Sequence, residues 1–83
     1  MAKSFWLINA NRSEVRRFIK NTNNKDQFFD YMFIDSGKII SIFGNEPPLM
    51  KTREEFKIDE AREIWKKLLA QGWRITEPVW EDL

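Results

Sequence analysis

The feature that most constrains the fold is an apolar stripe with helical spacing in the last third of the chain. Apolar residues recur there at positions i, i+3, i+4, i+7 and i+8, namely Ala61, Ile64, Trp65, Leu68 and Leu69. Gly72 follows, where the left-handed residue that ends many helices belongs. The pattern predicts an amphipathic helix over about residues 59–71 that buries only one face. Its start stays open between a capping box at Thr52 and an N-cap at Asp59, of which Asp59 is favoured.

The segments before and after this helix have the composition of strands and turns. Strands are expected at 5–8 and 14–20 around a turn at 9–13, at 28–34 and 39–43 around a turn at 35–38, and at a sheet edge over 73–80. A bulge near Arg16 and Arg17 would bring Val15 and Phe18 to one face of the sheet. Residues 49–53 fit either an extended connector or the entrance to the helix.

These elements predict a single small α+β domain over residues 1–83. An antiparallel sheet of three to five strands would carry the helix on one face. No internal repeat or linker divides the chain. Because a domain of this size buries only about 60–65% of the surface that its unfolded chain exposes, large aromatic side chains are expected to supply much of the core.

Two absent residue types exclude much of enzyme chemistry. The sequence contains no cysteine and no histidine, which removes disulfides, most structural zinc sites and the commonest nucleophiles and bases. Carboxylate pairs occur, but a helix start or a solvated terminus accounts for each of them. An oxygen-ligand metal site from Asp30 and Asp35 lacks the EF-hand pattern. We therefore expect a protein that is not an enzyme, with no catalytic residue, no cofactor and no metal ion.

Positive charge gathers at the start of the chain, although the net formal charge is only +1. Residues 1–25 contain one acidic residue, Glu14, and six basic residues, namely Lys3, Arg12, Arg16, Arg17, Lys20 and Lys25. This arrangement predicts a basic face on one strand or hairpin. Such charges commonly do no more than deter aggregation of an edge strand. Together with Phe18 and Trp6, they also fit surfaces that bind single-stranded nucleic acid, where aromatic rings stack on bases and cations follow phosphates.

Four tryptophans are many for a chain of this length. Trp65 lies on the apolar stripe and Trp73 follows Gly72, so both are expected in the core. Trp6 and Trp80 fit either the core or an exposed anchor for a partner, because Trp and Arg dominate interface hot spots. The residues predicted to contact a partner are Trp6, Arg16, Arg17, Phe18, Arg53 and Trp80.

The leading functional hypothesis is a non-enzymatic protein–protein interaction module or small regulatory adaptor with an unidentified protein partner. The alternative is a single-stranded RNA- or DNA-binding domain that uses the basic N-terminal hairpin. A homodimer is a further option, because an exposed edge strand or aromatic patch can pair with its copy. The first residues lack the apolar core of a signal peptide, and no stretch is long enough for a transmembrane helix. With no cysteine, the chain suits a reducing compartment, so we expect a cytoplasmic protein without membrane contact.

Several short segments together form a pattern that is known from one family. They are residues 6–9, 15–18, 46–53, 60–65, 71–74 and 77–80. In these segments the chain resembles a small single-domain family of marine cyanobacteria and their phages, domain of unknown function 1651, over nearly its whole length. The ending Gly-Trp-Arg-x-x-x-Pro-x-Trp is the most specific part. The resemblance implies a cytoplasmic cyanobacterial or cyanophage protein, and it brings no assigned activity, cofactor or catalytic residue.

Overall fold

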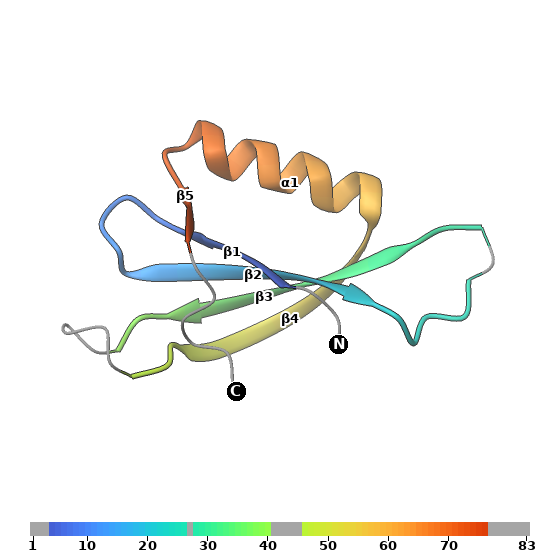
Figure 1. Ribbon diagram of the computed structural model, residues 1–83, viewed down its shortest axis with the longest axis horizontal. Helices are drawn as coiled ribbons and strands as arrows, with labels where there is room; N and C mark the ends of the chain where they lie inside the picture. Colours follow the sequence, from blue (N-terminus) through green and yellow to red (C-terminus); the bar gives the residue numbers. More distant parts are fainter. Residues whose placement is uncertain (1–3, 27, 41–45, 77–83) are drawn as a thin grey trace.

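A five-stranded antiparallel sheet with one helix across it makes up the part of the chain that the structure describes (Figure 1). The structure is a computed structural model, and it describes residues 4–26, 28–40 and 46–76. The elements are β1 (Ser4–Ile8), β2 (Glu14–Asn21), β3 (Tyr31–Lys38), β4 (Leu49–Lys57), α1 (Ile58–Ala70) and β5 (Arg74–Thr76). The strands lie in the order β4-β3-β2-β1-β5. The predicted α+β class is confirmed, with the sheet at the upper end of the expected size.

The two faces of the sheet carry different side chains, because successive residues of a strand point to opposite sides. In the central strand β2, Phe18 points toward α1, on what we call the helix face. Its neighbour Arg17 points to the opposite side, which we call the distal face. β2 pairs with β3 so that Arg17 lies opposite Asp35 and Phe18 opposite Ile34. The division between the faces therefore continues from strand to strand.

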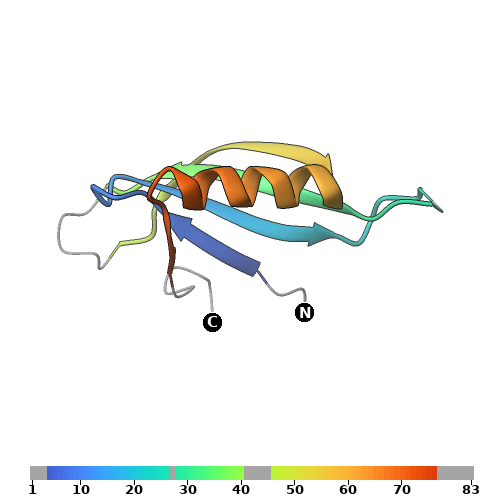
Figure 2. The same cartoon turned by 90° about the horizontal axis from the view of Figure 1, so that it is seen from above.

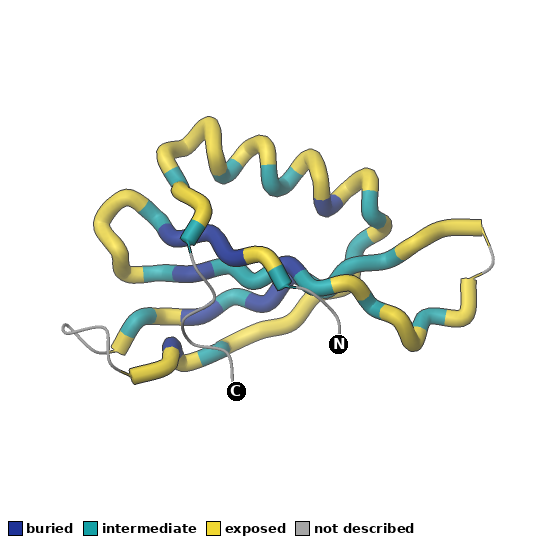
Figure 3. The backbone as a smooth tube through the Cα atoms, viewed as in Figure 1, coloured by how far each residue is buried: buried dark blue, intermediate teal, exposed yellow. Residues whose placement is uncertain are grey.

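The hydrophobic core is split between the two faces. On the helix face, the buried residues Leu7, Phe18, Ile34 and Ala61 form one cluster. The half-buried residues packed against it are Met32, Phe56, Ile64, Trp65, Leu68 and Trp73. A second buried cluster consists of Trp6, Ile8 and Val15, with Ile39 and Met50 packed against it. Figure 3 shows these buried stretches on neighbouring strands.

The helix begins and ends within one residue of its predicted limits. At its start, the backbone N–H of Lys57 donates to the Glu60 carboxylate at 3.2 Å. The N-cap is therefore Lys57, so both predicted capping positions, Thr52 and Asp59, are wrong, although the helix starts one residue before the predicted limit. Asp59 lies instead in the first turn, where a negative charge suits the helix dipole. In the described part of the chain, no helix is long and apolar enough to cross a membrane.

The end of α1 confirms the predicted role of Gly72. Its N–H donates to the Leu69 carbonyl at 3.1 Å, and the Trp73 N–H donates to the Leu68 carbonyl at 3.0 Å. This is the Schellman pattern, and it requires the positive φ of 96° that Gly72 adopts. The turn brings Trp73 against the helix-face core, as expected.

Strand β3 lies several residues later than the sequence predicted. The expected turn at 35–38 is wrong, because β3 continues through these residues and pairs with both β2 and β4. Gly37 serves a close approach there, since a Cβ atom would come within 2.7 Å of the Met50 sulfur and 3.0 Å of the Leu49 carbonyl oxygen. The expected strand at 39–43 is not found at 39–40, and its remainder lies outside the described residues. Residues 49–53, which fitted a connector or a helix entrance, belong to β4.

The first hairpin is close to its prediction, with one correction. Strands at 5–8 and 14–20 are confirmed as β1 and β2. The turn between them is held by the Asn9 side-chain oxygen, which accepts from the backbone N–H groups of Ser13 and Glu14 at 2.8 and 2.9 Å. The predicted bulge near Arg16 is wrong, because β2 pairs regularly with both neighbours and leaves Val15 and Phe18 on opposite faces. The irregularity lies instead in the pairing of β3 with β4, between Ser36 and Gly37.

Replacing Gly72 tests how much the helix end depends on a positive φ. Nothing lies within 4 Å of the position that a Cβ would take, so Gly72→Ala isolates the backbone effect. We expect it to lower the free energy of unfolding by about 1–2 kcal/mol. Gly72→Asn should lose less, because Asn tolerates the left-handed region better. Urea unfolding of the three proteins measures both effects, and equal stability of the Ala variant and the parent would contradict this account.

Candidate functional site

Three charged side chains from adjacent strands meet on the distal face. Arg17 of β2, Asp35 of β3 and Arg53 of β4 lie directly opposite one another in the sheet register. Arg17 donates from Nε and Nη2 to Asp35 Oδ2 at 2.9 and 2.6 Å. Arg53 donates from Nε to Oδ1 at 2.7 Å and from Nη2 to Oδ2 at 2.9 Å. We call this arrangement the ion triad.

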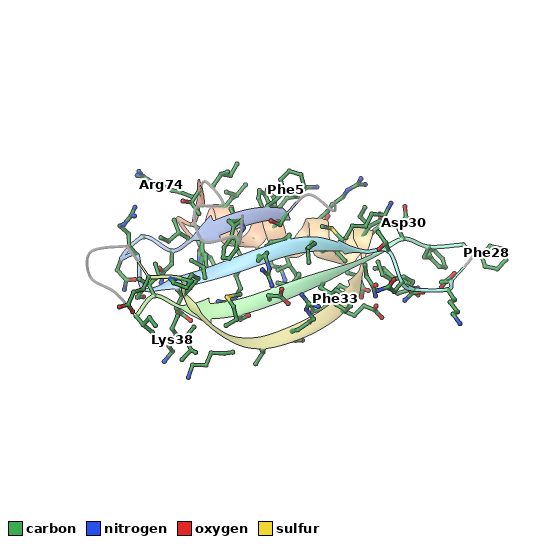
Figure 4. All side chains as sticks on the ribbon, turned by 60° about the horizontal axis from the view of Figure 1, so that its bottom comes forward. Phe5, Phe28, Asp30, Phe33, Lys38 and Arg74 are labelled. Atoms are coloured by element: carbon green, nitrogen blue, oxygen red, sulfur yellow. The ribbon has the colours of Figure 1, made fainter. Side chains whose placement is uncertain are left out.

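The triad is buried at its centre and open at its flanks. The Asp35 side chain is only 3% exposed, whereas those of Arg17 and Arg53 are 26% and 49% exposed. Each guanidinium also lies over an aromatic ring. Arg17 is 5.5 Å from the centroid of Trp6, and Arg53 is 4.3 Å from that of Phe33, which Figure 4 labels on the distal side of the sheet. Both arginines are therefore fixed along one edge by the carboxylate and supported by a ring.

Asp35 stays ionised because two opposing influences do not cancel. Burial, the largest influence, raises its pKa, but the hydrogen bonds and charges of Arg53 and Arg17 together lower that pKa below its ordinary value. The hydrogen bonds from Arg53 to Asp35 raise the pKa of Arg53 in turn. The centre of the triad is thus a full negative charge shared by two full positive charges.

A polar hollow of about 310 Å³ opens beside the triad. Its lining consists of Arg17, Asp35, Met50, Lys51, Thr52 and Arg53. Three cations and one carboxylate line it, so its net charge is positive. Glu55, the next β4 residue on the distal face, does not line the hollow and accepts a hydrogen bond from Asn21.

A second hollow, apolar and larger, lies beside the first half of α1. We call it the groove, and its volume is about 440 Å³. It is lined by Phe5, Phe18, Lys20, Met32, Ile58, Ala61, Arg62 and Trp65. It exists because α1 runs over β3 and leaves β1 to one side, as the view from above shows (Figure 2). Phe5 of β1 is consequently 51% exposed at its wall, and Lys20 and Arg62 bring positive charge to it.

The sequence-predicted contact residues are divided between the two faces. Arg17 and Arg53 come together in the triad, with Trp6 beneath Arg17. Arg16 and Phe18 point the other way. Arg16 lies over the ring of Trp73 at 4.9 Å and 3.8 Å from the Glu14 carboxylate. The structure therefore does not gather these residues into one basic and aromatic patch.

Two of the predicted contact residues, Trp6 and Phe18, offer no exposed ring. Trp6 is 2% exposed and belongs to the distal cluster. Phe18 is also 2% exposed and meets the ring of Trp65 edge-on, with 5.0 Å between centroids. Trp80 lies outside the described residues. Both described rings are core residues, which is the packing role that small domains give to large aromatics.

Sequence reasoning missed Asp35 and most of the groove. From the sequence, Asp35 is predicted only as a residue of the turn at 35–38 and, with Asp30, as an oxygen ligand in a metal site without the EF-hand pattern. Asp35 directly follows the apolar residues 31–34, but Ser36, Gly37 and Lys38 come after it, so no local signal marked it as a buried acid. The groove had no local signal either, since its walls come from four separate elements. In the described ranges, no three acidic side chains gather in a way that would hold a metal ion.

The loop between β2 and β3 extends to one end of the molecule (Figure 1), and it carries two further aromatic residues. Phe28 is 87% exposed and Phe29 is 51% exposed. The Asp26 carboxylate shapes this loop by accepting from the Phe28 and Phe29 N–H groups at 2.8 and 3.2 Å and from the Tyr31 hydroxyl at 2.8 Å. Lys57 lies over the Phe29 ring at 4.2 Å.

Comparison with known proteins identifies the family. A family model described as a protein of unknown function, DUF1651, matches residues 4–80. The chain belongs to the DUF1651 family. The match spans every described element, so the sheet, the triad and the groove all lie within the family's domain. No curated protein and no solved structure matches the chain.

Asp35→Asn tests the energetic weight of the triad in this DUF1651 domain. The substitution removes the negative charge and leaves two guanidinium groups facing each other, so we expect a loss of about 1–3 kcal/mol in unfolding free energy at neutral pH. Because the folded-state pKa of Asp35 is lowered, its contribution is fully present above the unfolded pKa of about 3.9 and is lost as pH falls through the folded pKa.

The stability difference between the parent and Asp35→Asn should therefore shrink below about pH 4. Urea unfolding over a series of pH values measures this difference. The control is Glu63→Gln, which removes an exposed pair with Lys66 at 3.5 Å and should cost no more than about 0.5 kcal/mol. A difference that stays constant with pH would show that the charge of Asp35 is not what stabilises the fold.

Proposed function

We propose that this DUF1651 protein is a non-enzymatic interaction module that binds a segment of a partner protein in the groove. The observation that carries the proposal is the groove itself, an apolar hollow of about 440 Å³ with a half-exposed Phe5 at its wall. Hollows of this kind accept large side chains of a partner, and such buried anchors supply most of the affinity of small interfaces.

The charges of the groove indicate what the partner segment is like. Lys20 is exposed and forms no ion pair with any described residue. Among the residues that the structure describes, Arg62 pairs only with the Asp59 carboxylate, at a long 4.0 Å, and that side chain is 86% exposed. Both cations are therefore free to meet a carboxylate. The occupant that fits is an amphipathic segment with one large apolar side chain and an acidic residue beside it.

Nucleic-acid binding through the basic hairpin draws less support. That hypothesis needs Phe18 to stack on a base, and Phe18 is buried beneath α1. It also needs Arg16 and Arg17 on one surface, and they point to opposite faces with an acid paired to each. The protein-binding hypothesis does not depend on either residue.

Self-association through the β4 edge of the sheet is disfavoured by the charge of that strand. β4 is the outer strand on one side, and its charged side chains lie between Lys51 and Lys57. Its charged residues are Lys51, Arg53, Glu54, Glu55 and Lys57. Charged edge strands resist pairing with a copy. We accordingly favour a different protein as the partner over a homodimer.

The cellular setting is part of the proposal. A chain without cysteine suits a reducing compartment, so we propose that the module acts in the cytoplasm. The cyanobacterial or cyanophage origin rests on the family resemblance alone.

A peptide selection tests the groove. Peptides selected from a random library against the pure protein should share a large apolar residue and an adjacent acid. Reversing both groove charges, with Lys20→Glu and Arg62→Glu, should weaken their binding about tenfold or more, and Phe5→Ala should do the same. The matched control reverses one strand charge and one helix charge outside the groove, with Lys38→Glu and Lys67→Glu, and should bind as the parent does.

Amide NMR locates the bound peptide. Shifts confined to the groove residues would support the proposal. Equal weakening by both double variants would mean that the binding is nonspecific, and shifts centred on another surface would place the interaction site there. If the library yields no binder while a single-stranded oligonucleotide binds with steep salt dependence, the nucleic-acid alternative replaces the interaction module.

A further inference from the structure

We propose that the ion triad and its hollow on the distal face form a binding site for a phosphate monoester dianion. This site lies on the side of the sheet opposite the groove, so it is independent of the proposed partner segment. The argument rests on unused hydrogen-bond donors, on net charge and on the way the two arginines are held.

The two arginines have donors to spare. A guanidinium has five N–H groups, and Arg17 and Arg53 each use Nε and Nη2 on Asp35. No other acceptor in the described part of the chain bonds to either of them. Each arginine therefore keeps its Nη1 group and one hydrogen of Nη2. Both side chains reach solvent, at 26% and 49% exposure, so these donors are available to a ligand.

The charge of the hollow selects a dianion. Its lining contains three cations, Arg17, Lys51 and Arg53, and one carboxylate, Asp35. A phosphate monoester carries nearly two negative charges at neutral pH and presents three oxygens. It would neutralise the hollow, whereas a carboxylate or a phosphodiester would neutralise half of the charge. Paired guanidinium groups match phosphate oxygens through two parallel hydrogen bonds each.

The arginines are held in place before any ligand arrives. Asp35 fixes one edge of each guanidinium, and the rings of Trp6 and Phe33 support their planes at 5.5 and 4.3 Å. Because these side chains do not need to be ordered on binding, the entropic cost of forming the site is small. An ion pair that served only stability would need one cation for the Asp35 carboxylate, whereas the triad has two arginines.

The first test titrates the labelled protein with inorganic phosphate and follows the Nε–Hε NMR signals of Arg17 and Arg53. We expect these signals to shift and saturate, while sodium chloride at equal ionic strength leaves them in place. Binding should weaken between about pH 7.5 and pH 5, because phosphate loses its second charge near pH 6. The chain has no histidine, so the change is expected from the ligand and not from the protein.

Arg53→Lys tests the two-pronged contact while it keeps the charge. It should lower phosphate affinity about tenfold, the change expected for one lost charge-assisted hydrogen bond. Arg53 lies on an edge strand and is half-exposed, so the variant should fold. The matched control is Arg16→Lys, an arginine of the same sheet that points to the helix face, and its affinity should not change. Equal losses in both variants, or none in either, would overturn the assignment.

Separate ligands identify the source of the phosphate. A phosphoserine peptide and a nucleoside 5′-monophosphate both carry the dianion, and the one that binds more tightly than inorganic phosphate names the source. A serine peptide without phosphate should not bind. Tighter binding of a single-stranded oligonucleotide, per phosphate, would make the hollow a phosphodiester site and contradict the monoester assignment. Saturable binding of none of these ligands would leave the triad as a purely structural ion pair and end the proposal.

Discussion

The alternation of side chains in the central strand β2 separates the helix face of the sheet from its distal face. Its neighbours Arg17 and Phe18 must point to opposite faces, because a strand alternates its side chains. Phe18 then meets Trp65 of α1, and Arg17 meets Asp35 of β3. The helix-face core and the ion triad therefore start from two adjacent residues. As a result, the groove and the cationic hollow lie on opposite sides of one sheet.

Local signals were sufficient for the elements that depend on short-range chemistry. The helical spacing that runs from Ala61 and the glycine at position 72 located α1 and its end within one residue. The signals failed in β3, where Asp35 and Gly37 resemble turn residues. Asp35 lies in a strand because guanidinium groups from two other strands neutralise it, and Gly37 because Met50 comes close to its backbone. Both reasons involve distant residues, which no window along the sequence contains.

Dependence on distant residues also explains why the sequence predicted only part of the candidate site. Arg17 and Arg53 were singled out as charges, but their shared partner Asp35 depends on the register of three strands. The basic and aromatic cluster at 16–18 was read as one patch because its residues are adjacent in sequence. Strict alternation in β2 separates them, and the bulge that would have joined them is absent from this strand. The alternation of side chains along β2 decides which residues share a face. The apolar residues of β2 follow this alternation imperfectly, so the sequence did not reveal it.

The ion triad gives the sheet a register that apolar contacts alone specify weakly. Both faces of β1 and β2 carry buried apolar residues, with Leu7 and Phe18 on one side and Trp6 and Val15 on the other. A slip by one residue would exchange two apolar sets at modest cost. A one-residue slip of β3 against its neighbours would turn Asp35 toward the helix-face core, away from both guanidinium groups, and an unpaired buried charge costs several kcal/mol. The penalty against the wrong register thus comes from the charge. The carboxylate that imposes it also holds the two arginines, which keep donors that Asp35 does not use, so the contact that fixes the register also prepares the hollow for an anion.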